Sequence, residues 1–135
     1  MTSLGKRIRL ERIVNRKTKK SIVVPMDHGL TLGTISGLEN MPLIVNKIAK
    51  GGANAVLVHA GIAEIGHRGS TSGVESQADL GLIVHLSGST TLSPYPNKKM
   101  LVCSVEQALA LGADAISIHV NIGSEAEPDQ LEQLG

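Results

Sequence analysis

The feature that most limits the fold of this chain is a pattern that occurs twice, sixty residues apart. Residues 52–59 read GANAVLVH, and residues 112–119 read GADAISIH. Each copy has the composition of a helix end, a tight turn and a short buried strand, and each finishes on a histidine. A helix that leads into a buried strand is the repeating unit of parallel α/β sheets. The repeat therefore predicts strands at 55–58 and 115–120 in the same sheet.

Two more short runs complete a series of four strands. Residues 22–24 are Ile-Val-Val, a β-branched run of the kind that a fully buried strand carries, and the run stops at Pro25. Residues 82–84 are Leu-Ile-Val and are followed by His85. Because strands of this kind join into a parallel sheet through right-handed helical crossovers, the runs predict four β-then-α units in series.

Helices are predicted before the first strand and between the strands. Residues 3–16 have apolar side chains at helical spacing. Three further helices have start signals, which are Asn40 with Pro42, Ser104 with Gln107, and Ser124 with Glu127. Residues 60–79 carry spaced glycines and predict a long loop, and loops of that length are usually functional or disordered.

Four units are half of a (β/α)8 barrel, which typically needs about 250 residues. The chain has 135 residues, so we expect one domain, residues 1–135, that forms the N-terminal half of a TIM-type parallel (β/α) barrel. Four parallel strands leave two open edges and an aliphatic inner face, and such surfaces favour association. We therefore expect a truncated product, or a chain that pairs with a second copy as a homo-oligomer or with a separately made C-terminal half.

Composition narrows the partners and the location. The net charge is +1, and one Tyr is the only aromatic residue, so the core is expected to be aliphatic and little aromatic surface can stack on bases. The first twenty residues hold many lysines and arginines, which we interpret as an exposed helix. No apolar stretch approaches a membrane span, and the single cysteine forms no internal disulfide. We predict a cytoplasmic protein that binds neither nucleic acid nor membrane.

Ionisable side chains follow the strands. The segment Asp-His-Gly comes directly after the first strand, and a histidine ends each of the other three. The carboxyl ends of parallel strands meet at one edge of a sheet, where ligands bind in α/β proteins. The sequence therefore predicts one rim that carries five titratable residues: Asp27, His28, His59, His85 and His119.

Several interpretations of this rim stay open on the residues alone. Asp27 could simply bond nearby backbone amides in a turn. Three of the histidines with Asp27 could bind a divalent metal, although their spacing matches no compact metal motif. Alternatively, the rim could bind a carbonyl substrate, with Asp27 as a general acid or base and the Ser/Gly/Thr-rich loop after His85 donating backbone amides to phosphate or hydroxyl groups.

Five segments together resemble a known family. They are PMDHG, GGANAVLVHAG, GHRG, LIVHLSGSTTLSPYPN and GADAISIHVNIGSE. From about residue 5 to its end, the chain resembles the archaeal-type class I aldolases of the DhnA group. Within this group the segment SGSTTLSPYPN favours the 2-amino-3,7-dideoxy-D-threo-hept-6-ulosonate synthases, transaldolase-type enzymes of archaeal aromatic amino acid biosynthesis. The class I fructose-bisphosphate aldolases of the same group are the alternative.

The resemblance implies a (β/α)8 barrel that uses no metal and no cofactor and forms an imine between a lysine and a ketose phosphate. The implied donor is a 6-deoxy-5-ketofructose phosphate, and the implied acceptor is L-aspartate semialdehyde. Asp27 matches the family's proton acceptor on the first strand. The segment that lines the family's ketose site is matched here by Asp27, His28, Gly29, Leu30 and Thr31.

The same resemblance places the imine-forming lysine on the sixth strand and the proton-donating tyrosine on the fifth, beyond the four units of this chain. None of the chain's own lysines is expected at the carboxyl end of a strand, and Tyr95 lies in a Pro-flanked turn. We therefore expect no Schiff-base activity from these residues alone. Two other functions remain as alternatives: a metal-dependent lyase or hydrolase that uses the histidine rim, and a non-catalytic module that binds a sugar phosphate or a partner chain.

Overall fold

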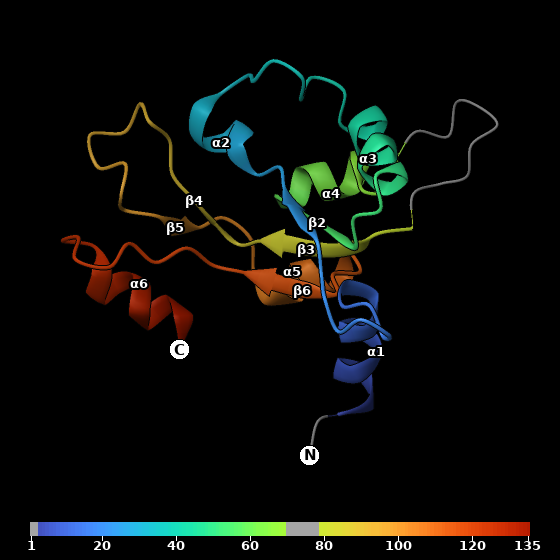
Figure 1. Cartoon of the computed structure of the whole chain (residues 1–135). Coiled ribbons are helices and arrows are strands. Elements are labelled where there is room, and N and C mark those ends of the chain that lie inside the picture. Colours follow the sequence, from blue (N-terminus) through green and yellow to red (C-terminus); the bar gives the residue numbers. More distant parts are fainter. Residues whose placement is uncertain (1–2, 70–78) are drawn as a thin grey trace.

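The computed structural model describes residues 3–69 and 79–135. Four strands form one parallel sheet in the order β1-β2-β3-β6 (Figure 1). Their bounds are Val23–Pro25 for β1, Ala55–Val58 for β2, Gly81–His85 for β3 and Ala115–Ser117 for β6. The order follows the sequence and confirms the four predicted strands, although the fourth is shorter than expected.

Helices flank the sheet on both sides. In the described residues they are α1 Leu4–Ile13, α2 His28–Leu32, α3 Met41–Lys50, α4 Ala60–Gly66, α5 Val105–Ala110 and α6 Glu127–Leu134. None of these described helices is long and apolar enough to span a bilayer.

Helix α4 corrects the interpretation of residues 60–79 as a long loop. Residues 60–66 are helical, and residues 70–78 lie outside the described part of the chain. Ile62 and Ala63 pack against the main hydrophobic core. The prediction was wrong here because tertiary packing of an apolar helix face outweighs the low helix propensity of the glycines.

The strands pair in one continuous register. The ladder sets Pro25 beside Leu57, Leu57 beside Ile83, and Ile83 beside Ala115. Parallel pairing of this kind brings the carboxyl ends of all four strands to the same edge of the sheet. Residues that are far apart in the sequence therefore become neighbours just beyond this edge.

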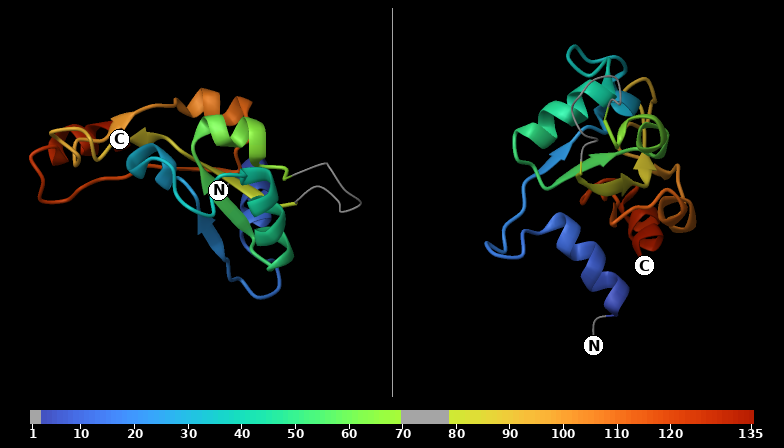
Figure 2. Two further views of the ribbon diagram at one scale, coloured as in Figure 1. Left: turned by 90° about the horizontal axis from the view of Figure 1, so that it is seen from above. Right: turned by 90° about the vertical axis from the view of Figure 1, so that its right-hand side faces the viewer.

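The main hydrophobic core covers one face of the sheet. Its fully or nearly fully buried members are mostly aliphatic, as the composition predicts, and include Val56, Val58, Leu82, Val84 and Leu86 from the strand segments with Val45 from α3 and Ala108 from α5. Helices α3 and α1 lie on opposite sides of the strands (Figure 2). Burial of this aliphatic face is the main source of stability for a sheet of this size.

The opposite face is partly covered by the end of α1. Ile13 packs with Ala55 and Ile83 in a second, smaller cluster. The guanidinium of Arg12 binds both carboxylate oxygens of Asp114, with Nε 2.9 Å from Oδ1 and 3.0 Å from Oδ2. The Asp114 side chain is only 6% exposed, so this ion pair anchors the basic N-terminal helix to the sheet.

The two copies of the sequence repeat have the same local structure. Gly52 and Gly112 have φ of +86° and +84°, in the left-handed region that glycine adopts at a helix end. Two residues later, Asn54 and Asp114 each accept a hydrogen bond from the backbone N–H at the start of the neighbouring strand, at 2.9 and 3.0 Å. The shared pattern thus reflects a shared turn that fixes the register of each new strand.

Strands β1 and β6 form the edges of the sheet. Among the described residues, each pairs with one neighbour only. Ile22 and Val23 are 60% and 38% exposed, and Ile116 is 44% exposed. The prediction of a fully buried strand at 22–24 is therefore wrong in this structure, because no second described strand covers its outer edge.

An antiparallel hairpin extends from the carboxyl end of β3 beside α2 (Figure 1). It pairs β4, Ser87–Gly88, with β5, Met100–Leu101. The sequence predicts only a loop and a turn for this segment, so the strand pairing is a difference from that prediction. A Cβ atom at Gly88 would collide with Leu30 Cδ2, so the glycine lets the hairpin lie close to the segment after β1.

Two of the three predicted helix starts are confirmed. The Asn40 side chain accepts a hydrogen bond in the first turn of α3, and Ser104 with Gln107 forms a complete capping box. The capping box of Ser124 with Glu127 is wrong. Ser124 donates its hydroxyl to a carbonyl three residues earlier at 2.8 Å, and the Glu127 carboxylate accepts from a backbone N–H four residues earlier at 2.6 Å. Helix α6 therefore begins without a side-chain cap.

The contact between α1 and β3 predicts a strong effect of Gly81→Ala. A Cβ at Gly81 would lie 2.9 Å from the Arg12 carbonyl oxygen and 3.1 Å from Ile13 Cγ1, so either α1 or β3 must shift. We expect the free energy of unfolding, measured by urea denaturation, to fall by about 1–3 kcal/mol.

Gly61→Ala is the matched control, because an added Cβ at Gly61 meets no atom within 4 Å and the residue lies inside α4. We expect this variant to keep the free energy of unfolding or raise it by up to about 1 kcal/mol. Equal losses in the two variants would contradict the close packing of α1 on the sheet.

Candidate active site at the carboxyl edge of the sheet

A small hollow lies at the carboxyl edge of the sheet, with a volume of about 260 Å³. Its lining residues are Asp27, His28, Thr31, Leu32, His59, His85, Ser87, Lys99 and His119. All five titratable residues predicted to share one rim are in this set, so the predicted clustering is confirmed. The in-register ladder is the reason, because it places the residues after β1, β2, β3 and β6 side by side.

Asp27 connects β1 to α2. Among the described residues, its carboxylate accepts no hydrogen bond that caps α2, so the interpretation of Asp27 as a simple turn residue gains no support from this contact. Its oxygens lie 3.9 Å from His28 Nδ1 and 3.8 Å from His85 Nε2. The side chain is about one-quarter exposed, at 26%, and so can meet a ligand in the hollow.

His85 is the most buried titratable group of the hollow. Its Nδ1 lies 2.6 Å from Ser117 Oγ, and its Nε2 lies 3.4 Å from Ser87 Oγ. Burial lowers the pKa of His85 below the usual value of a histidine, and this outweighs the opposite effect of the Asp27 charge. The lowered pKa favours the neutral form of the His85 ring.

Two further rim histidines, His59 and His119, also have defined partners. His59 Nδ1 lies 3.2 Å from the His85 carbonyl oxygen, and the two rings are tilted with centroids 5.2 Å apart. The backbone N–H of His119 donates to Ser87 Oγ at 2.9 Å, and its ring Nε2 lies 3.1 Å from Asn121 Oδ1. These bonds hold the walls of the hollow in place.

The rim does not form a metal site in this arrangement. Across residues 3–69 and 79–135, no group of three or more His, Cys, Asp or Glu side chains is placed to hold a metal ion. The alternative of a metal-dependent enzyme therefore gains no support from the geometry of this part of the chain.

The segment 27–31 borders two cavities. Asp27, His28 and Thr31 line the small hollow. Gly29 and Leu30 line a neighbouring cavity of about 790 Å³, which Asp27 and His59 also border. All five residues predicted from the family resemblance thus lie where a ligand can reach them, and Asp27 lies where the two cavities meet.

Lys99 is a lining residue that sequence reasoning missed. It precedes β5 and follows no parallel strand, but the β4–β5 hairpin carries it back to the rim. Its Nζ donates a hydrogen bond to Ser89 Oγ at 3.0 Å, and Lys99 takes part in none of the described ion pairs. The signal that could have found it is the Pro-rich turn between two short apolar runs, which is typical of a hairpin.

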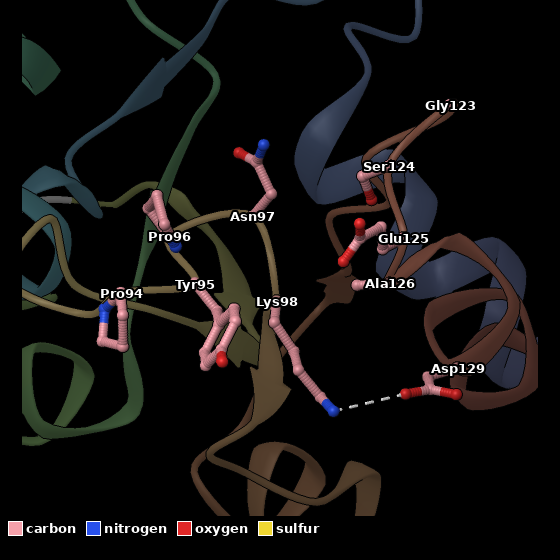
Figure 3. Close-up of a pocket in the computed structure, with 10 residues that line it drawn as sticks. All are labelled: Pro94, Tyr95, Pro96, Asn97, Lys98, Gly123, Ser124, Glu125, Ala126 and Asp129. Atoms are coloured by element: carbon pink, nitrogen blue, oxygen red, sulfur yellow. Dashed lines mark ion pairs between the residues drawn. The ribbon is translucent and has the colours of Figure 1, made fainter.

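Tyr95 lies in a different place. It lines a cavity of about 690 Å³ between the Pro-flanked turn and the start of α6 (Figure 3). The charged side chains there include Lys98, whose Nζ lies 3.6 Å from Asp129 Oδ2. Although this cavity is larger than the hollow, it lacks the Asp27 and histidine cluster, and Tyr95 is absent from the lining of that hollow.

Two buried histidines predict how stability depends on pH. His85 and His67 both have a pKa lowered chiefly by burial, and His67 Nε2 lies 2.9 Å from the Leu80 carbonyl oxygen. Below about pH 6.5 the unfolded chain binds more protons at these positions than the folded chain does. The free energy of unfolding therefore decreases as the pH falls. We expect the free energy of unfolding to decrease from pH 7.5 to 5.5, by at most about 1.4 kcal/mol per pH unit for each histidine.

The double variant His67→Gln/His85→Gln should have a shallower pH dependence in the same denaturation experiment. Gly61→Ala, which removes no titratable group, should keep the full slope. A slope that is unchanged in the double variant would show that other groups cause the pH dependence.

A parallel β/α sheet with ionisable side chains at its carboxyl edge is the arrangement of β/α-barrel enzymes. The family model described as DeoC/LacD family aldolase matches residues 21–135. The chain belongs to this family of aldolases.

Relatives with assigned names agree with the family. The chain is 46% identical over 132 residues to "2-amino-3,7-dideoxy-D-threo-hept-6-ulosonate synthase 1" of Archaeoglobus fulgidus, covering 98% of this chain and 47% of the relative. It is 36% identical over 129 residues to "2-amino-4,5-dihydroxy-6-oxo-7-(phosphonooxy)heptanoate synthase" of Streptomyces griseus, covering 94% of this chain and 44% of the relative. The chain therefore spans about half the length of the curated relatives that it matches.

Solved structures give the same result. A Schiff-base-forming fructose-1,6-bisphosphate aldolase is similar with a TM-score of 0.75 and 30% identity, covering 96% of this chain and 50% of that one. An archaeal fructose-1,6-bisphosphate aldolase, with its catalytic lysine covalently bound to the carbinolamine intermediate, has a TM-score of 0.71 and 29% identity, covering 96% of this chain and 49% of that one. The four β/α units are thus a partial α/β barrel, as the sequence predicts.

Proposed function

We propose that this chain supplies the first four β/α units of a Schiff-base aldolase or transaldolase that joins a ketose phosphate donor to an amino-acid aldehyde. Asp27 is the proton acceptor, and residues 27–31 line the donor site. One observation carries the proposal: the Asp27 carboxylate stands at the carboxyl end of β1, caps no helix, and lines a hollow that it shares with the buried His85.

The chemistry needs a base in this position. A lysine amine condenses with the donor ketone, releases water and forms a protonated imine, which draws electrons from the neighbouring carbon. When the donor's C–C bond breaks, its hydroxyl proton passes to a carboxylate, the hydroxyl-bearing fragment leaves as an aldehyde, and the electron pair of the broken bond forms an enamine on the lysine. The enamine then attacks the acceptor aldehyde and forms the new C–C bond. The acceptor oxygen takes up a proton, and water hydrolyses the imine to release the product and the free lysine. A carboxylate that accepts no helix-capping hydrogen bond is well suited to this proton transfer.

The names of two relatives support a particular acceptor. Both products, from the Archaeoglobus and Streptomyces proteins, are seven-carbon 2-amino acids with a ketone at the sixth carbon. Breaking such a β-hydroxy ketone between the fourth and fifth carbons leaves a four-carbon 2-amino acid aldehyde, which is L-aspartate semialdehyde. We propose this acceptor for the present chain, with a 6-deoxy-5-ketofructose phosphate as donor, in aromatic amino acid biosynthesis in the cytoplasm of an archaeon.

The imine-forming lysine and the proton-donating tyrosine belong, in this proposal, to further β/α units. Residues 1–135 form one domain, the N-terminal half of the barrel. The partly exposed edge strands β1 and β6 are where the remaining units pair, either in a homo-oligomer or with a C-terminal half. The proposal requires no cofactor.

A class I fructose-bisphosphate aldolase is the second candidate. The likeness to two solved aldolases of this activity supports it. The acceptor separates the two candidates, since a fructose-bisphosphate aldolase uses a phosphorylated aldehyde with no carboxylate, whereas the synthase uses an amino acid aldehyde.

The test is borohydride trapping with the ketose phosphate, followed by intact mass. The chain is treated alone and after mixing with the C-terminal half of the Archaeoglobus relative. We expect an adduct only in the mixture, and only on the added half. An adduct on the 135-residue chain alone would contradict the proposal, and no adduct in either sample would favour a non-catalytic binding module.

Asp27→Asn tests the role of the carboxylate in the same mixture. We expect turnover to fall by about 10²- to 10⁴-fold, the usual effect of removing a general base, while borohydride still traps the donor. Asp129→Asn is the matched control, because Asp129 lies beside Lys98 and away from the hollow. Equal turnover in the two variants would rule out Asp27 as the proton acceptor.

A further inference from the structure

The loop between β4 and β5 is attached to both ends of the site. Thr91 donates its backbone N–H and its hydroxyl to the Thr31 carbonyl oxygen, at 3.0 and 3.1 Å. At its other end, the Asn97 carbonyl oxygen accepts from Asn121 Nδ2 at 2.8 Å. The loop therefore joins the segment after β1 to the segment after β6, and its position relative to Asp27 is fixed.

Within this loop, one hydroxyl orients one lysine. Ser89 donates its hydroxyl to the Pro96 carbonyl oxygen at 2.7 Å and accepts from Lys99 Nζ at 3.0 Å. The two prolines of the turn restrict the backbone between them. The Pro-flanked turn, which the proposed reaction leaves without a role, thus holds the Lys99 ammonium at the hollow.

Lys98 and Lys99 are neighbours with opposite surroundings. Lys98 is exposed and lies 3.6 Å from the Asp129 carboxylate, in the cavity of Figure 3. Lys99 is half-buried, faces the hollow of Asp27, and has no carboxylate partner among the described ion pairs. Its charge adds to burial in lowering the pKa of His85, which is consistent with a position close to that ring.

We propose that Lys99 binds the carboxylate of the aldehyde acceptor. This inference rests on the proposed function, and it names the residue that selects the acceptor. Among the residues that line the hollow, Lys99 is the one lysine, and there is no arginine. An ammonium held by a neutral hydroxyl keeps two donors for a ligand, and its charge-assisted hydrogen bond to a carboxylate is a strong one.

A short amino acid aldehyde has a reacting end and a carboxylate end, and the hollow offers Asp27 for the first and Lys99 for the second. The Asp27 carboxylate transfers a proton near the aldehyde carbon that reacts, and the Lys99 ammonium binds the carboxylate at the other end of the acceptor. An acceptor without a carboxylate would leave the lysine without an anionic partner, and the resulting loss of affinity is what discriminates between acceptors. Lys99 is thus a specificity-determining residue of the proposed reaction.

The test is an NMR titration of the ¹⁵N-labelled chain with two probes, L-2-aminobutyrate and inorganic phosphate. L-2-aminobutyrate has the carboxylate and amine of the acceptor but no aldehyde. Wild type is compared with Lys99→Met, which removes the charge, Lys99→Arg, which keeps it, and Lys98→Met as the matched control. Unchanged amide shifts away from the hollow show that each variant keeps its fold.

We expect L-2-aminobutyrate to shift the amide signals of Ser89 and Lys99 in the wild type. Lys99→Met should weaken its binding about tenfold or more, the effect of losing a hydrogen bond to a charged group. Lys99→Arg and Lys98→Met should bind within about threefold of wild type.

Equal binding in wild type and Lys99→Met, or no binding to the wild type, would overturn the proposal. Phosphate binding that needs Lys99, without binding of L-2-aminobutyrate, would overturn the choice of a carboxylate.

Two readouts in the mixture with the C-terminal half separate the role of Lys99 from the proposed function. Borohydride trapping of the ketose phosphate requires no acceptor, so Lys99→Met should leave it intact in the mixture with the C-terminal half. In the same mixture, Lys99→Met should raise KM for L-aspartate semialdehyde about tenfold while KM for the ketose phosphate stays unchanged. An increase of KM for the donor instead would assign the lysine to the donor phosphate.

Discussion

The parallel pairing of β2 with β3 is the interaction on which the rest of this structure depends. Its register sets Leu57 beside Ile83, and the same register extends outward to β1 and β6. The buried aliphatic side chains of these central strands hold α3, α4 and α5 on one face. Because the strands stay in step, every segment that follows a strand emerges at the same edge, and side chains that are far apart in the sequence meet there in one site.

The same geometry explains why the fold is incomplete at its sides. The two central strands are buried, whereas Ile22 in front of β1 and Ile116 in β6 are substantially exposed. An aliphatic parallel sheet reaches full burial when it closes into a barrel or receives further strands. The hollow lies at the carboxyl edge of this sheet, so in the proposed barrel the remaining β/α units would bring their own side chains toward Asp27.

Much of the fold followed from local chemistry that the sequence displays. The repeated Gly-Ala-Asn/Asp-Ala segment predicted two strands, because its glycine ends a helix and a short apolar run that ends in a histidine follows the turn. The caps at Asn40 and Ser104 followed from the same kind of local rule. The clustering of Asp27 with the histidines followed from strand order alone. Helix α4 and the β4–β5 hairpin could not be predicted in this way, because tertiary packing determines both. Lys99 was missed for that reason, because only the hairpin brings it to the rim.

The most direct test of the account is a crystal structure of the borohydride-reduced donor adduct, formed in the mixture of this chain with a C-terminal half-barrel. The account predicts a closed barrel, with β1 and β6 paired to strands of the added half. The reduced donor would be attached to a lysine of that half, with a donor hydroxyl within hydrogen-bond distance of the Asp27 carboxylate. An adduct attached to Lys99, or a donor whose hydroxyls all lie away from Asp27, would contradict it.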